Sequence, residues 1–276
     1  MNKSGENASA LNRAHYDLLD SKKEFVNISP HLKHKTLKDL YLCLVNKCVS
    51  VVTSKNNTST PRVLDLGSGD GEATLSFLSS DCAVTAVDIS IEQLNRFNEY
   101  YPQYKSRCTI VCSDVIEFIE NSNEQFDIIV LNSFLHHVPD YISLLNKVAD
   151  STKASVIFIF QDPIYYQSLN KFSRLFSKIA YLSWRITQGD ILNGIKRRLA
   201  RNTGDFSDPL NSIEYHVVRD GVNQDEIATT LVHLGYLVSY IPYFSTQSVV
   251  FQWLGDKFGV ENTFAIIATY DASEFS

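Results

Sequence analysis

The sequence predicts an α/β protein that is built on a doubly wound, mostly parallel β-sheet. A short apolar run at 62–66 leads into a glycine-rich turn at 67–71, and a helical pattern follows that turn. Short apolar runs and helical patterns then alternate as far as residue 160. The run at 126–132 is almost continuously apolar, which is typical of a parallel strand buried on both faces. A sheet covered by helices on both sides explains these three observations.

The N-terminal region, residues 1–61, is expected to form a helical cap on this sheet. Apolar residues recur with helical spacing at 11–27 and again at 37–52. Pro30 separates the two predicted helices, because proline disrupts a helix interior. The polar segment 54–61 then leads to the first strand.

The predicted core occupies two stretches, 62–162 and 212–276. Its strands are expected at 62–66, 83–88, 109–112, 126–132, 154–160, 237–244 and 264–270. Its helices are expected at 91–100, 141–149 and 224–234, with a further helical stretch inside 245–262. Ser90 is placed to cap the helix at 91–100, since serine is a favoured N-cap residue.

Residues 163–211 break the alternation and are too long for an ordinary connection. They begin with many aromatic side chains and continue with clustered cations between 185 and 201. We expect a helical insert that lies beside the ligand-binding edge of the sheet and serves as a lid. The cations could contact an anionic group or an anionic membrane surface, or they could form the wet side of an amphipathic helix. Of these two interpretations, we favour the second, in which the cations form the solvent-exposed side of an amphipathic helix.

Composition argues against several classes of protein. A net charge of -6 and a pI near 5.6 disfavour a general nucleic-acid binder. The five cysteines are an odd number without zinc-site spacing, so we expect no disulfide framework, no metal site and a cytoplasmic protein. No apolar run reaches the ~20 residues that span a bilayer. The oligomeric state is left open.

The glycine turn indicates the kind of ligand. It reads Asp65-x-Gly67-x-Gly69-x-Gly71. Acidic side chains at Asp65, Asp70 and Glu72 would repel a pyrophosphate, but they suit a cationic ligand without phosphate, such as S-adenosyl-L-methionine. The segment resembles the first motif of the S-adenosylmethionine-dependent methyltransferases with a Rossmann-like fold. That resemblance implies a seven-stranded sheet with a terminal antiparallel strand pair.

The resemblance also implies a set of cofactor-binding positions. An acid at the end of the second strand, Asp88, would bind the ribose hydroxyls, although it could instead cap a helix. Asp114 would accept from the adenine amino group, with the alternative that it caps the next helix. Asp65 would bind the ammonium or organise the glycine loop. The full expected set is Tyr16, Asp65, Gly67, Ser68, Gly69, Asp88, Ile89, Asp114, Val115 and Asn132.

A second motif follows the fourth strand and would carry the chemistry. It reads Asn132-Ser133-Phe134-Leu135-His136-His137-Val138-Pro139-Asp140 and resembles the family's fourth motif. It lacks the Asn-Pro-Pro-Tyr form that is used on nucleobase amino groups. Histidine is the usual base near neutral pH, so we consider His137 first, then His216, then His136. His137 could instead pack under the Pro139 turn, and Asp162 could bind substrate or act as the base.

The sequence therefore predicts a methyltransferase that uses S-adenosyl-L-methionine and acts on a small or medium-sized metabolite. A hydroxyl oxygen in a sugar, glycolipid or secondary metabolite is the first choice of acceptor, and a nitrogen is the second. The alternatives are an NAD-dependent oxidoreductase and a non-catalytic, cofactor-binding regulatory subunit. The expected partner is a small molecule, and nucleic acid is not expected.

Overall fold

The computed structural model describes residues 13–14, 30–56, 58–152, 154–188, 215–217 and 220–270. Most of the helix expected at 11–27, including Tyr16, lies outside these residues. The same holds for 189–211 of the expected insert, and so for most of the cations between 185 and 201.

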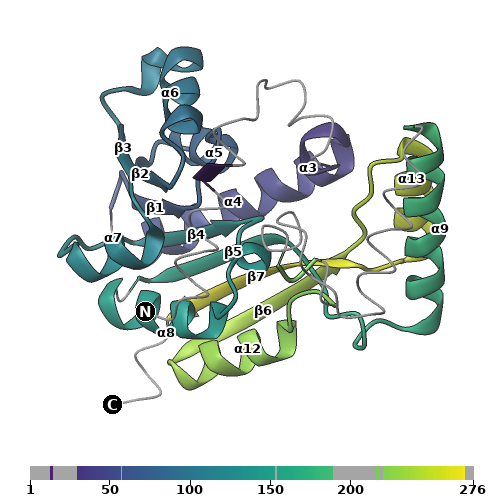
Figure 1. Ribbon diagram of the computed structural model, residues 1–276. Coiled ribbons are helices and arrows are strands. Elements are labelled where there is room, and N and C mark those ends of the chain that lie inside the picture. The colour runs from purple at the N-terminus through teal and green to yellow at the C-terminus, as the bar shows by residue number, and fades with distance from the viewer. Residues whose placement is uncertain are drawn as a thin grey trace.

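Seven strands form one sheet in the order β3-β2-β1-β4-β5-β7-β6 (Figure 1). The strands are β1 (Arg62–Leu66), β2 (Ala83–Asp88), β3 (Cys108–Cys112), β4 (Ile128–Asn132), β5 (Val156–Pro163), β6 (Tyr236–Tyr243) and β7 (Thr263–Tyr270). The first five pair in parallel, whereas β7 is antiparallel to both β5 and β6. The predicted fold class and the terminal antiparallel pair are confirmed.

The strand order reverses at β1, which pairs with β2 on one side and β4 on the other. Ligands of open α/β sheets bind outside the carboxyl ends of the strands at such a switch point. The glycine turn follows β1 and the second motif follows β4, so both lie at this point.

Helices cover both faces of the sheet (Figure 1). They are α3 (Pro30–Lys33), α4 (Lys35–Asn56), α5 (Glu72–Ser79), α6 (Ile91–Tyr100), α7 (Val115–Asn121), α8 (Tyr141–Thr152), α9 (Lys171–Thr187), α12 (Gln224–His233) and α13 (Val249–Phe258). Side chains of α4, α5 and α6 share a buried cluster on one face, and those of α7, α8 and α12 share one on the other. Alternate residues of β1 enter opposite clusters, for example Val63 and Leu64, as expected for a strand covered on both sides.

The ends of several helices follow the sequence. Ser90 accepts a hydrogen bond from the backbone N–H of Gln93, which confirms the predicted cap of α6. The predicted helix at 37–52 extends over Lys35–Asn56, because the polar residues at its end continue the helix. The stretch inside 245–262 is helical as expected.

The N-terminal helices are tied to the C-terminal part of the chain. The Nε2 atom of His34 lies 2.7 Å from the carbonyl oxygen of Thr246, and Lys33 donates to the carbonyl oxygen of Gln247 at 2.8 Å. Thr36 donates to the carboxylate of Asp256 at 3.1 Å. These contacts hold α3 and the start of α4 against the segment that follows β6.

The described part of the insert contains α9, which begins after the N-cap Asn170. The helix packs beside α13 at one end of the molecule (Figure 1), where the Phe176 ring lies 5.7 Å from that of Phe251 and 5.5 Å from that of Phe244. The first helix of the insert therefore contacts the C-terminal part of the core. A lid role for the insert stays a prediction.

Candidate active site

The polar residues predicted from the sequence meet at the carboxyl edge of the sheet. Asp65, Asp88, Asn132 and Asp162 lie at or near the carboxyl ends of β1, β2, β4 and β5. The three turn glycines have positive φ angles of 72°, 53° and 82°, a left-handed conformation that glycine adopts without strain. The predicted sharp turn after β1 is therefore present.

Two of these glycines are required by packing inside the protein. A Cβ atom on Gly67 would lie 2.2 Å from the Phe134 ring, and one on Gly71 would lie 2.1 Å from the Phe97 ring. A Cβ atom on Gly69 would meet only the Gln93 side-chain oxygen, at 2.9 Å, among the atoms that the structure describes. Packing against protein rings explains the glycines at 67 and 71. At position 69, the close approach of a ligand can explain why the residue is glycine.

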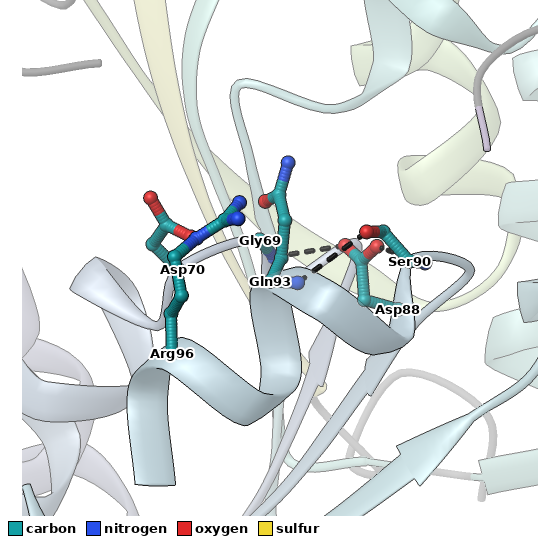
Figure 2. Close-up of polar contacts among 6 residues, drawn as sticks. All are labelled: Gly69, Asp70, Asp88, Ser90, Gln93 and Arg96. Atoms are coloured by element: carbon teal, nitrogen blue, oxygen red, sulfur yellow. Dashed lines mark hydrogen bonds and ion pairs between the residues drawn. The ribbon is translucent and has the colours of Figure 1, made fainter. Parts of the chain in front are cut away.

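Asp88 holds the glycine turn against β2. Its Oδ2 accepts from the backbone N–H of Gly69 at 2.8 Å, and its Oδ1 accepts from the N–H of Ser90 at 2.8 Å (Figure 2). Burial raises the pKa of the carboxyl, while these N–H groups oppose that rise. Each carboxylate oxygen can accept more than one hydrogen bond, so Asp88 retains the capacity to accept from ribose hydroxyls.

Asp70 is balanced by a cation. The Nε atom of Arg96, on α6, lies 3.0 Å from the Asp70 carboxylate, and both side chains are largely buried (Figure 2). One of the three acids that were expected to repel a phosphate is therefore neutralised within the protein. The charge argument for a cationic ligand therefore rests on Asp65 and Glu72, without Asp70.

Asp65 is completely buried and only half satisfied. Its Oδ2 accepts from the Thr74 hydroxyl at 2.6 Å, whereas its Oδ1 has no partner among the described residues. Burial raises the pKa of this carboxyl to about 7, and the charge of Asp88 adds to that rise. One oxygen binds the side chain of Thr74 in α5, and the other remains able to accept from a ligand.

Further buried oxygens near this edge have no hydrogen-bond partner in the described part of the chain. Besides Asp65 Oδ1, they are Ser68 Oγ, Asn132 Oδ1 and Asp162 Oδ2. A buried polar atom without a partner costs about 1–3 kcal/mol, so native proteins retain few of them without a reason. A ligand rich in donors, such as one with an ammonium group and hydroxyls, would satisfy these acceptors. The residues therefore fit S-adenosyl-L-methionine.

His136 and Asp162 form a buried pair. The Nδ1 atom of His136 lies 2.8 Å from Asp162 Oδ1, and the same oxygen accepts from the His136 backbone N–H at 3.0 Å. Asp162 is fully buried after a bulge in β5, where Gln161 has a φ of 68°. The sequence ranks His136 last among the three histidines, but the structure orients it through two hydrogen bonds with Asp162.

The other two histidines lie beside this pair. The His137 ring is 4.0 Å from the His136 ring between centroids. His216 is far along the chain, yet its backbone N–H donates to the His136 carbonyl at 2.9 Å. Its Nε2 lies 2.9 Å from the carbonyl oxygen of Val138. All three histidines predicted as bases therefore gather at one place.

Two polar side chains of the cap were not recognised in the sequence. Both ring nitrogens of His31 and the hydroxyl of Tyr41 are buried without a partner among the described residues. Their rings lie 6.1 Å and 4.8 Å from the ring of Phe160, which precedes Gln161 and Asp162. Burial lowers the pKa of His31 to about 4, so its imidazole is neutral. No motif in the N-terminal helices marks either residue.

The residues predicted to bind adenine, Asp114 and Val115, lie where a helix cap explains them equally well. Asp114 accepts from the backbone N–H of Ile116 at 2.9 Å and caps α7, which begins at Val115. The capping alternative is thus present, and adenine binding by Asp114 and Val115 stays a prediction, as does the role of Ile89. Tyr16 lies outside the described residues.

Comparison with known proteins agrees with this geometry. The profile of a family described as "Methyltransferase domain" matches residues 35–193. A curated relative, carboxy-S-adenosyl-L-methionine synthase of Campylobacter fetus, is 25% identical over 131 residues, which are 46% of this chain. The match spans 55% of that relative, which is about half of its length.

Two solved structures have a similar fold. Magnesium protoporphyrin IX methyltransferase from Synechocystis, with bound S-adenosylmethionine, gives a TM-score of 0.52 at 10% identity, with 96% of this chain and 97% of that chain covered. A candidate sarcosine dimethylglycine methyltransferase from Galdieria sulphuraria gives 0.50 at 15% identity, with 85% and 86% covered. The family match covers more than half of the chain, and the sheet order is that of the fold. The chain therefore belongs to the S-adenosylmethionine-dependent methyltransferase family with the class I Rossmann-like fold.

Proposed function

We propose that the protein transfers the methyl group of S-adenosyl-L-methionine to a hydroxyl oxygen of a small or medium-sized metabolite, such as a sugar, glycolipid or secondary metabolite. The observation that carries this proposal is the His136–Asp162 pair, which lies at the same sheet edge as the unpaired oxygens of Asp65 and Asn132. A base beside the cofactor-binding edge is what a hydroxyl acceptor requires, since its proton must leave as the new bond forms.

The cofactor would be held mainly by the loop after β1 and by the end of β2. Asp88 would accept from the ribose hydroxyls, and Asp65 Oδ1 would accept from the ammonium group. Gly69 would allow the ligand to lie against the backbone, because among the described residues a Cβ atom there would meet only the Gln93 side-chain oxygen. The bound cofactor supplies an activated methyl group on a sulfonium, so the protein chiefly has to position the acceptor and exclude water.

The proton would be taken by His136. Asp162 accepts from the Nδ1–H of the imidazole, which fixes the tautomer and leaves the lone pair on Nε2. The second bond from the His136 backbone N–H keeps the carboxylate in place. As Nε2 accepts the acceptor's proton, the buried carboxylate stabilises the imidazolium that forms.

A nitrogen acceptor is the second candidate. The unpaired Oδ2 of Asp162 supports it, because a carboxylate oxygen at this edge would bind an N–H donor. The curated relative's name raises a third possibility, in which the protein modifies the cofactor itself. The regulatory-subunit alternative predicts that the isolated chain has no turnover.

One assay separates these functions. The isolated chain is incubated with methyl-labelled cofactor and fractionated pools of hydroxyl-bearing and amine-bearing metabolites. The proposal expects label in a hydroxyl compound, with the methyl position assigned by NMR. Label on nitrogen would favour the nitrogen acceptor. An altered mass of the cofactor without an acceptor would favour modification of the cofactor itself, and no turnover with any pool would favour the regulatory subunit.

We also propose that the insert helps to form the acceptor site. Replacement of 189–211 by a short flexible linker leaves the packed helix α9 in place. The variant is expected to retain cofactor affinity by calorimetry and to lose turnover. Normal turnover on the identified acceptor would show that residues 189–211 are not needed to form the acceptor site.

A further inference from the structure

The helix α9 carries an exposed apolar stripe. Five large side chains recur along one side of it, each between 48% and 60% exposed: Phe172, Leu175, Ile179, Leu182 and Ile186. A different side of the helix packs on the protein through Ser173, Ala180 and Phe176. The stripe therefore faces away from the core, although side chains of this kind are usually buried.

Cations adjoin this stripe. The helix contains Lys171, Arg174, Lys178 and Arg185 and has no acidic residue, whereas the whole chain has a net charge of -6. Helical spacing places Lys171 and Lys178 on one side, next to the apolar stripe. No salt bridge joins Lys171, Arg174 or Lys178 to an acid in the described part of the chain.

The aromatic neighbours keep these cations near the helix. Arg174 and Lys178 each lie 5.0 Å from the centre of the Tyr166 ring. Alongside α9, Trp253 of α13 is 60% exposed, and Lys257 lies 5.2 Å from its ring centre. Two adjacent helices thus both present aromatic and aliphatic side chains together with cations.

We propose that α9 docks the protein on an anionic lipid surface, with its apolar stripe in the boundary between headgroups and acyl chains. An interfacial helix has this composition: a wide apolar side, flanking lysine or arginine, and no acid. The exposed Lys171 and Lys178 contact anionic headgroups while the stripe leaves water. No helix in the described ranges is long and apolar enough to cross a bilayer, so the helix lies along the surface.

Charge distinguishes this partner from a second copy of the chain. A dimer formed through the same stripe would bring a second set of these cations to one interface, with no acid from α9 to pair with them. An anionic bilayer pairs with the cations and buries the stripe at the same time. The proposal does not depend on the methyl acceptor, and its test does not use activity.

The test uses the full chain and vesicles of phosphatidylcholine with or without phosphatidylglycerol. We expect sedimentation with the anionic vesicles, at least tenfold weaker binding to pure phosphatidylcholine, and loss of binding in high salt. The chain has two tryptophans, Trp184 on α9 and Trp253 on α13, so quenching by brominated lipid reports contact at these helices. Wild-type protein that does not bind the anionic vesicles overturns the proposal.

Matched variants locate the surface. Leu175→Gln with Ile179→Gln removes part of the stripe, and Leu42→Gln with Val232→Gln makes the same change at exposed apolar residues of α4 and α12. We expect the first pair to weaken binding at least tenfold and the control pair to bind normally. Equal binding by both pairs overturns the assignment to α9.

A charge pair tests the second half of the proposal. Lys171→Glu with Lys178→Glu is compared with Lys38→Glu and Lys47→Glu, which make the same charge change on exposed lysines of α4. Only the α9 pair is expected to abolish binding. A concentration-dependent dimer that the Leu175→Gln, Ile179→Gln variant dissociates, without vesicle binding by the wild type, would assign the stripe to a second copy instead.

Discussion

One carboxylate oxygen of Asp162 accepts two hydrogen bonds from His136, from Nδ1 at 2.8 Å and from the backbone nitrogen at 3.0 Å. The two residues come from β5 and from the turn after β4, so the imidazole is fixed to the sheet edge rather than to a loop alone. An imidazole that is held in this way retains its orientation when a ligand binds.

We expect His136→Gln to lower kcat on a hydroxyl acceptor by about 10²–10⁴-fold without a change in cofactor affinity. Asp162→Asn should lower kcat as well, because the tautomer of His136 is no longer fixed, whereas the acidic limb of the pH–rate profile should vanish in His136→Gln. His137→Gln and His216→Gln serve as matched controls at the neighbouring rings. Stopped-flow rates for the four variants decide the order, and a larger loss in His137→Gln would restore the ranking that the sequence suggests.

The cofactor prediction concerns Asp88. Asp88→Ala should weaken binding of S-adenosyl-L-methionine and of its demethylated product equally, because both contain the same ribose. The variant also loses the contact to the Gly69 N–H, so affinity alone does not identify the ribose contact. Calorimetry with a 2′-deoxy analogue of the product separates the two roles. Removal of the 2′-hydroxyl should weaken binding to the wild type much more than to Asp88→Ala, and equal losses would argue against ribose binding.

The glycine turn makes a prediction about stability. Gly71→Ala should lower the free energy of unfolding by about 1–3 kcal/mol, because the new methyl group meets the Phe97 ring and the left-handed backbone becomes strained. Urea titration of Gly71→Ala with Phe97→Leu should show partial recovery. Gly69→Ala also places an alanine in a left-handed conformation, but it has only the flexible Gln93 nearby, so it should cost less stability. Additive effects of Gly71→Ala and Phe97→Leu would contradict the packing explanation.

Two buried groups shift stability with pH in opposite directions. The pKa of Asp65 is raised to about 7, so between pH 4 and 7 the folded state holds a proton that the unfolded state has lost, and stability falls as pH rises. The pKa of His31 is lowered to about 4, so between pH 4 and 6.5 the unfolded state holds the extra proton, and stability rises with pH.

Single variants should reveal each contribution against the wild type. Relative to wild type, Asp65→Asn should gain about 1.4 kcal/mol of stability per pH unit as pH rises from 4 to 7. His31→Gln should lose about the same amount per unit between pH 4 and 6.5. Unfolding free energies measured at half-unit steps test both slopes. Parallel pH curves for a variant and the wild type would mean that the group titrates normally in the folded state.

Local patterns in the sequence predict the strands, most helices and the sheet edge that carries the polar residues. The glycine turn and the strand ends are local features, so Asp65 and Asp88 are found without knowledge of distant contacts. The pairing of His136 with Asp162 is different, because it depends on the register of β4 with β5 and on the bulge at Gln161. Neither feature has a signature in the sequence.

The same reason explains what the sequence missed in the cap and in the turn. His31 and Tyr41 are buried beside the sheet edge because α3 and α4 pack on Phe160, and this packing cannot be read from the sequence. The rings that cover Gly67 and Gly71 come from segments at 134 and 97, so the sequence does not reveal the packing that requires glycine at these two positions. The Arg96–Asp70 pair also depends on the packing of α6 against the turn.

The contacts of His34 with Thr246 and of Lys33 with Gln247 join positions more than 200 residues apart. A ribosome makes α3 more than 200 residues before the backbone carbonyls that hold it. These contacts can therefore form only after residues 246 and 247 have been synthesised. Until then α3, which carries His31, lacks the hydrogen bonds that tie it to the C-terminal part of the chain, and a chain that ends before residue 246 would lack them permanently.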